Sequence, residues 1–134
     1  MDTSGDRRSD GARLVATTHE PVATVGPRIR RYVRDLLVNW GLGGEIVENA
    51  LIVVEELVAN VVDHAHTRFA LVVRLSGQVL RIAVRDGCAS DPVLQPFDPN
   101  AERGRGLQLV ASLSQRWGFD HHDGGKTVWA DLAA

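Results

Sequence analysis

A polar stripe runs along a segment that otherwise has the pattern of a buried helix. In EELVANVVDH, residues 55 to 64, Glu56, Asn60 and His64 recur at every fourth position among apolar residues. Residues four apart stand about one turn apart on one face of a helix. A carboxylate can orient or deprotonate a nucleophile, and an amide oxygen suits Mg²⁺, which prefers oxygen ligands. Glu56 and Asn60 are therefore a candidate general base and metal ligand, while Asp63 and His64 favour no role; a solvated helix edge is the alternative.

A second candidate group is RDGC, residues 85 to 88. Asp86 ends a β-rich run and Gly87 follows it, so a carboxylate stands at the end of a predicted strand while the backbone can turn closely around a ligand. Such a carboxylate suits an exocyclic amine. An ordinary strand-to-loop turn explains the same residues.

Two glycine-containing segments are candidate phosphate sites. GRGLQLV, residues 104 to 110, leads into a predicted helix whose first N–H groups can bind an anion, but it lacks the third glycine and preceding strand of a dinucleotide fingerprint. GGKT, residues 124 to 127, imitates the end of a Walker P-loop, but Asp120 stands where that motif needs glycine, and VWADL predicts a strand. Lys126 can still reach a phosphate. Thr127 can place a hydroxyl beside a ligand, although threonine is also simply a good strand former.

Several possible metal ligands occur in the sequences DHAH and DHHD. They are Asp63, His64, His66, His121 and His122. The DHHD run resembles the short signature of a phosphoesterase family, whose upstream aspartate motifs are not evident. His64 and His66 are two apart and would not share a helix face. Solvent-exposed turn histidines are the alternative to a catalytic metal cluster.

The elements that position these residues follow from hydrophobic periodicity. In the first half we expect a strand over 13–18, a helix through RIRRYVRDLLVNW that ends at Gly41 with Pro27 in its first turn, and a helix from Gly44 to Ala65. A hairpin of RFALVVRL and VLRIAVRD follows, and then a long loop from Gly87 to Gly104. The chain is expected to close with a short helix GLQLVASLS and a hairpin of RWGFDHH and KTVWADL around Asp123, Gly124 and Gly125. This order predicts an α/β protein, a two-layer α/β sandwich in which helices cover one face of a mixed, mostly antiparallel sheet.

Length and charge limit the possible functions. A chain of 134 residues, 44% of them hydrophobic, is sized for one domain with a sizeable core. The net charge of -2 favours neither nucleic acid nor an anionic membrane, so we expect no direct contact with either, and an anionic ligand must be held locally. Cys88 is the single cysteine, which excludes a disulfide framework and fits a cytoplasmic setting. Residues 1 to 12 are expected to be a disordered leader without a signal peptide, followed by a domain over residues 13 to 134.

The order of these motifs resembles the GHKL ATPase superfamily, the Bergerat nucleotide-binding fold shared by gyrase, the heat-shock chaperones, sensor histidine kinases and mismatch-repair proteins. The likeness is carried by EELVANVVDHA, GRGLQLVASLSQRWG and GGKTVWADL and extends over about residues 13 to 132. It is most similar to the small stand-alone branch, the anti-sigma-factor serine kinases. The resemblance implies a histidine-kinase-like ATP-binding domain with ATP and Mg²⁺ as cofactors.

The resemblance also implies roles for single residues. Glu56 would be the general base and Asn60 the Mg²⁺ ligand, and Gly104 and Gly106 would bound a lid over the phosphates. Asp86 would accept a hydrogen bond from the adenine amino group, and Thr127 would assist at the adenine end. The predicted cofactor-binding set also contains Gly87, Cys88, Leu107, Arg105 and Lys126, the last two because a nearly neutral protein must supply local positive charge for a triphosphate. Cys88 departs from the superfamily, which usually has glycine at this third position of D-x-G.

The implied function is a Mg-ATP-dependent serine/threonine protein kinase that phosphorylates an anti-anti-sigma factor and controls transcription. A sigma factor is a second expected partner, and a homodimer through the first helix or strand is a further expectation. The alternatives are a nucleotide-dependent binding regulator that transfers no phosphate and, more remotely, a metal-dependent phosphoesterase. A histidine-kinase catalytic module is disfavoured, because no dimerisation or phosphoacceptor-histidine region precedes the domain.

Overall fold

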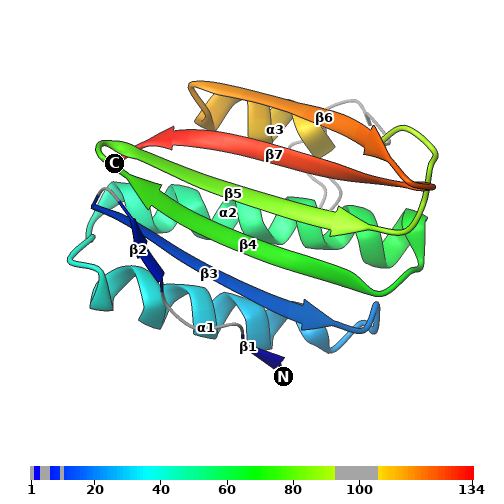
Figure 1. The fold of residues 1–134 in the computed structure, drawn as a ribbon, viewed down its shortest axis with the longest axis horizontal. Coiled ribbons are helices and arrows are strands. Elements are labelled where there is room, and N and C mark those ends of the chain that lie inside the picture. The colour runs from blue at the N-terminus through cyan, green and yellow to red at the C-terminus, as the bar shows by residue number, and fades with distance from the viewer. Residues whose placement is uncertain (1, 4–6, 10, 93–105) are drawn as a thin grey trace.

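One antiparallel sheet organises the part of the chain that the computed structural model describes, residues 2–3, 7–9, 11–92 and 106–134. Its strands are β1 (Asp2–Thr3), β2 (Arg7–Ser9), β3 (Ala12–His19), β4 (Phe69–Ser76), β5 (Val79–Asp86), β6 (Arg116–His122) and β7 (Gly125–Ala133). Their order is β1-β3-β4-β5-β7-β6, and β2 also pairs with β3. The C-terminal hairpin therefore extends the sheet from β5, with β7 in between and β6 at the edge (Figure 1).

The helices of the described residues cover one face of this sheet (Figure 1). They are α1 (Val25–Asn39), α2 (Glu45–Asn60), which continues as a π-helix η1 (Val61–Ala65), and α3 (Gly106–Leu113). α2 contacts both α1 and α3 and packs on β5 and β7. This arrangement confirms the predicted two-layer α/β sandwich, and every described strand pairing is antiparallel.

The core fills the space between the helices and the sheet. Alternate strand residues point toward the helices, so that the cross-strand neighbours Val73 and Ile82 are both buried. Helix positions that are 1% exposed or less complete it: Ile29, Val33, Leu37, Ala50, Leu51, Val53, Val54, Leu57 and Val110. Burial of each large aliphatic side chain contributes about 1.5–3 kcal/mol, so this layer supplies the main favourable term for folding.

The opposite face of the sheet carries an ion-pair cluster. Asp131 accepts hydrogen bonds from Arg81 Nε at 2.6 Å and from Arg116 Nη2 at 3.0 Å, and its side chain is only 2% exposed. The Arg81 guanidinium lies 4.3 Å from the ring centroid of Trp129, and Gly118 leaves room for that ring. The hydrogen bond from Arg81, opposed by burial and supported by Arg116, lowers the pKa of Asp131 below its ordinary value.

The predicted hairpins are present, with turns that suit their residues. Between β4 and β5 the chain turns at Gly77, whose φ is 59°. Between β6 and β7 it turns at Asp123 and Gly124, with φ of 36° and 80°, and two positive φ values are the mark of the type I′ turn that Asp-Gly favours.

The predicted helix over Gly44 to Ala65 ends differently from the prediction. It is a regular α-helix only to Asn60, because the His66 N–H bonds the Val61 carbonyl, five residues back, at 2.8 Å and His66 adopts a left-handed φ of 56°. A π-turn holds more residues than an α-turn. The four-residue stripe predicted through His64 therefore ends at Asn60.

The two short strands β1 and β2 lie beside the first long strand. The backbones of β1 and β2 pair with β3, which begins at Ala12. Residues 1, 4–6 and 10 lie outside the described residues, and the leader over residues 1 to 12 stays a prediction. Of the helices that the structure describes, none has both the length and the apolar character needed to cross a lipid bilayer.

Candidate functional site

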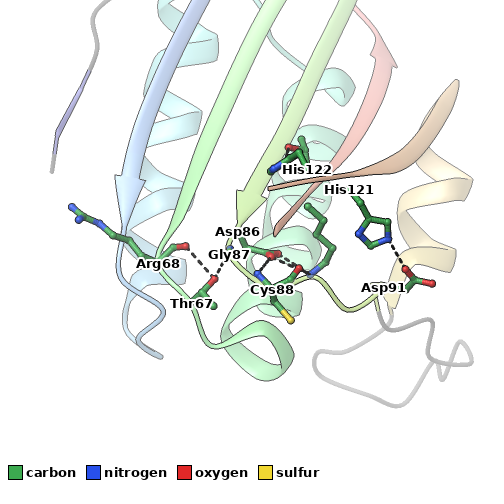
Figure 2. Close-up of polar contacts among 10 residues, drawn as sticks. Thr67, Arg68, Asp86, Gly87, Cys88, Asp91, His121 and His122 are labelled. Carbon is green, nitrogen blue, oxygen red and sulfur yellow. Dashed lines mark hydrogen bonds and ion pairs between the residues drawn. The ribbon is translucent and has the colours of Figure 1, made fainter. Parts of the chain in front are cut away.

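Asp86 is buried at the end of β5. It shares the helix-facing side of that strand with Ile82 and Val84, and its side chain is 1% exposed. Its Oδ1 accepts the N–H of Cys88 at 2.8 Å, two residues on, which fixes the chain in an Asx-turn (Figure 2). The turn interpretation and the binding interpretation of RDGC are therefore compatible, since the same carboxylate that shapes the turn faces the interior.

Lys126, the only lysine of the chain, lies against this carboxylate. β7 places it directly opposite Asp86, and its Nζ is 3.0 Å from Oδ2 and 3.1 Å from Oδ1. The same Nζ donates to the Cys88 carbonyl at 3.3 Å, and the lysine side chain is 3% exposed. The expected pair of roles, Asp86 at a base amine and Lys126 at a phosphate, is incompatible with this contact, because the base and the outer phosphates are opposite ends of a nucleoside triphosphate.

Two residues outside the predicted set hold this corner of the sheet. A Cβ at Gly125 would overlap the Asp86 carbonyl oxygen and lie 3.2 Å from the Gly87 Cα, so only glycine lets β7 approach the end of β5 this closely. The Gly87 N–H donates to Thr67 Oγ1 at 2.9 Å (Figure 2). The glycine pair at 124–125 was a readable signal for a close approach, whereas nothing in the sequence singled out Thr67.

Glu56 and Asn60 lie near the C-terminal end of α2. Glu56 is 7% exposed and Asn60 is partly exposed. The Thr67 bond ties the segment that follows η1 to the turn after Asp86, so the C-terminal end of the α2–η1 segment and the end of β5 lie at the same end of the sheet. Asp63 and His64 are exposed on η1.

An apolar cavity of about 400 Å³ lies on another side of α2, between it and α1. Its lining includes Val54, Val58 and Val62 from the α2–η1 segment. At 3.6 residues per turn, Glu56 and Asn60 stand roughly 130–170° around the helix from the centre of that lining. Because α2 is flanked by α1 and α3, this pair faces the α3 side, and the cavity does not belong to the candidate site.

The glycine-rich segment is only partly within the described residues. Gly104 and Arg105 lie outside them. Gly106 is the first residue of α3 and has a φ of 74°. Leu107 is 2% exposed and packs in the core, so the structure gives it a packing position and not a ligand-facing one.

Thr127 is separated from Asp86 by the sheet itself. It stands opposite Arg85, and neighbouring strand residues point to opposite faces, so Thr127 lies on the side away from the helices. There its hydroxyl contacts His122 Nε2 at 2.8 Å. Thr127 therefore does not share the side of the sheet on which Asp86 and Lys126 lie.

The histidines of DHHD point apart. His121 bonds Asp91 at 2.7 Å, while His122, the next residue in β6, bonds Thr127 on the other face. Across the described ranges, no group of three or more His, Cys, Asp or Glu side chains could hold a metal ion. The metal-cluster interpretation gains no support from this geometry.

Comparison with known proteins places the fold. The family model described as the histidine kinase-like ATPase domain matches residues 20–132. A crystal structure of the RsbU and RsbW domains of Rv1364c from Mycobacterium tuberculosis is similar, with a TM-score of 0.70 and 17% sequence identity over 90% of this chain and 32% of that one. This chain thus spans about a third of that protein, and at this identity the likeness concerns the fold alone. No curated protein matches the chain.

Proposed function

Because the chain belongs to the family of histidine kinase-like ATPase domains, we propose that it binds ATP with Mg²⁺ and transfers the terminal phosphoryl group to a serine or threonine hydroxyl of a protein partner. The family match confirms the GHKL-type resemblance over most of the chain. The finer activity is our proposal. The observation that supports it is that the end of α2 with Glu56 and Asn60 lies at the same end of the sheet as Asp86, as a single site with a base end and a phosphate end would require.

The residues present fit Mg²⁺. The amide oxygen of Asn60 is a hard donor of the kind that Mg²⁺ accepts, and the described residues hold no acidic or histidine cage that would bind the ion without substrate. Mg²⁺ commonly takes one or two protein ligands and completes its shell with water and phosphate oxygens. Asn60 would be that protein ligand, and the bound ion would supply neutralisation of phosphate charge.

Glu56 would act as the base. Its carboxylate would accept the proton of the attacking hydroxyl; the hydroxyl oxygen bonds the γ-phosphorus as the bond to the bridging oxygen breaks and ADP leaves. Its low exposure keeps it from bulk water, and its place one turn from Asn60 puts the proton acceptor beside the phosphate end. Catalysis then rests on alignment and charge stabilisation.

The proposed partner is an anti-anti-sigma-like protein that carries the acceptor hydroxyl, with a sigma factor as a second partner. The GHKL resemblance supports this, as does the RsbW domain in the similar solved structure. A cytoplasmic location and a homodimer belong to the same proposal.

Calorimetric titration with ATP and ADP, with and without Mg²⁺, is the first test. We expect ATP to bind at sub-millimolar concentration and more weakly when Mg²⁺ is removed or in Asn60→Ala. Asn49→Ala, three turns earlier on the same helix, is the matched control and should bind as the unmodified chain does. Folded protein that binds neither nucleotide at about 1 mM would refute the proposal.

Transfer is tested with labelled ATP and candidate partner proteins. Glu56→Gln should lower the transfer rate by about 10²–10⁴-fold, the usual contribution of a positioned base, with little change in ATP affinity. Glu55→Gln is the control, because Glu55 is the exposed neighbour and its ion pair with Arg30, at 3.9 Å, lies on the surface. If ATP binds but no partner is labelled, the chain is the nucleotide-dependent binding regulator instead.

A further inference from the structure

The buried pair of Asp86 and Lys126 is not explained by either residue's expected role. A lysine is rarely buried without a partner, and this one is enclosed at 3% side-chain exposure against a carboxylate at 1%. It is also the single lysine among 15 basic residues, the others being arginine. The pair lies on the helix-facing side of the sheet, at the corner that the proposed function assigns to the nucleotide base.

The position of the pair is fixed from several directions. Antiparallel register sets Lys126 opposite Asp86, and the missing side chain of Gly125 lets the two strands approach. Cys88 contacts both partners, since its N–H donates to Asp86 Oδ1 and its carbonyl accepts from Lys126 Nζ. The ammonium is therefore held beside Asp86 in the interior and is not a free surface charge that can move to a distant phosphate.

Each partner keeps hydrogen-bonding capacity. A carboxylate has about four acceptor positions, and Asp86 uses three of them, two for Lys126 and one for Cys88. An ammonium has three N–H donors. The two oxygens of one carboxylate, both about 3 Å from Nζ, can share one N–H, and the Cys88 carbonyl takes a second. Among the described residues, one acceptor position of Asp86 and one N–H of Lys126 thus remain beyond these bonds.

Resting on the proposed function, we propose that Lys126 is a second base-reading residue, whose ammonium donates to the ring nitrogen N1 of adenine while Asp86 accepts from the neighbouring 6-amino group. Adenine presents these two atoms next to each other, a donor beside an acceptor, which complements the acceptor and donor of the pair. A carboxylate alone would read only the amine. With Lys126 in place the base meets a pair of zero net charge, so its binding does not leave an isolated buried anion.

An ATP analogue that lacks one atom tests this contact. In 1-deaza-ATP a C–H replaces N1, so the analogue keeps the 6-amino group and cannot accept from Lys126. We expect the unmodified chain to bind 1-deaza-ATP at least about tenfold more weakly than ATP, the effect of losing one hydrogen bond to a charged donor. In Lys126→Met, which keeps the length of the side chain and removes the donor, the ratio of the two dissociation constants should fall to about 1.

The single lysine allows a second measurement that needs no variant. In the chain labelled selectively with ¹³C,¹⁵N-lysine, the side-chain signals of Lys126 stand alone. ATP should shift them strongly and 1-deaza-ATP should shift them much less. This readout remains available if Lys126→Met does not fold.

The outcomes separate this inference from the proposed function. Equal binding of ATP and 1-deaza-ATP to the unmodified chain, or an unchanged ratio in Lys126→Met, would overturn the base-reading role while ATP binding stands. Tighter ATP binding by Lys126→Met would overturn it too, and would make Lys126 an internal competitor for Asp86. Absence of any ATP or ADP binding would overturn the proposed function and this inference with it.

Discussion

Gly125 is the residue at which β7 passes closest to the end of β5, and Gly125→Ala tests that contact. The added methyl would overlap the Asp86 carbonyl oxygen and stand 3.2 Å from the Gly87 Cα. These are backbone atoms that cannot rotate away, so β7 or the Asp86–Gly87 segment must move. Overpacking of this kind costs about 1–3 kcal/mol. For a domain of this size each kcal/mol lowers Tm by roughly 3–6 °C, so we expect a loss of roughly 3–18 °C.

Thermal unfolding followed by circular dichroism measures this effect, and two other glycines provide matched controls. A Cβ at Gly43 would meet nothing within 4 Å, and one at Gly87 would meet only the Thr67 side chain, at 3.7 Å or more. Gly43→Ala and Gly87→Ala should change stability by no more than about 0.5 kcal/mol. If Gly125→Ala melted at the same temperature as these controls, the close approach of β7 to Asp86 would be wrong, and with it the positioning argument for Lys126.

Three further perturbations address other parts of the fold. Asp131→Asn should destabilise the chain by about 1–3 kcal/mol in urea unfolding, since Arg81 and Arg116 lose a buried charged acceptor. Because the pKa of Asp131 is lowered in the folded chain, this loss of stability is full above the ordinary pKa of the group and should shrink as pH falls below about 3.8. Burial, aided by nearby positive charge, lowers the pKa of His19, so the contribution of His19 to stability is present above about pH 6.5 and lost as pH falls below that value. His19→Gln should therefore lose less stability than the unmodified chain between pH 7.5 and 5. An identical dependence of stability on pH in the two chains would contradict the lowered pKa of His19. Leu107→Ala should cost about 2–5 kcal/mol and the less buried Leu109→Ala clearly less; equal effects would place Leu107 outside the core.

The hairpins and helices were predictable because their causes are local. The turn at Asp123 and Gly124 needs two positive φ values, and Asp-Gly supplies them. The apolar spacing of α2 and the four-residue offset of Glu56 and Asn60 lie within one continuous helix. The end of that helix was not predictable, because the bond from His66 to Val61 depends on how the chain turns to enter β4.

The candidate site shows the same division. Asp86 was identifiable from its place at the end of a β-run before glycine, but its partner was not. Lys126 is 40 residues away, and its contact with Asp86 exists only because the C-terminal hairpin pairs with β5 and not with another strand. A register shifted by one residue would have turned Thr127 inward and Lys126 outward, since side chains alternate along a strand.

Local sequence features were enough to predict the fold class, the order of its elements and the residue types at each end of the proposed site, because periodicity, turn chemistry and motif order act over a few residues at a time. Which residues of those ends touch depends on the tertiary structure. It joined Asp86 to Lys126, turned Thr127 away and packed Leu107 into the core, because strand pairing and register between distant segments are set by burial of the whole sheet face and not by any local pattern.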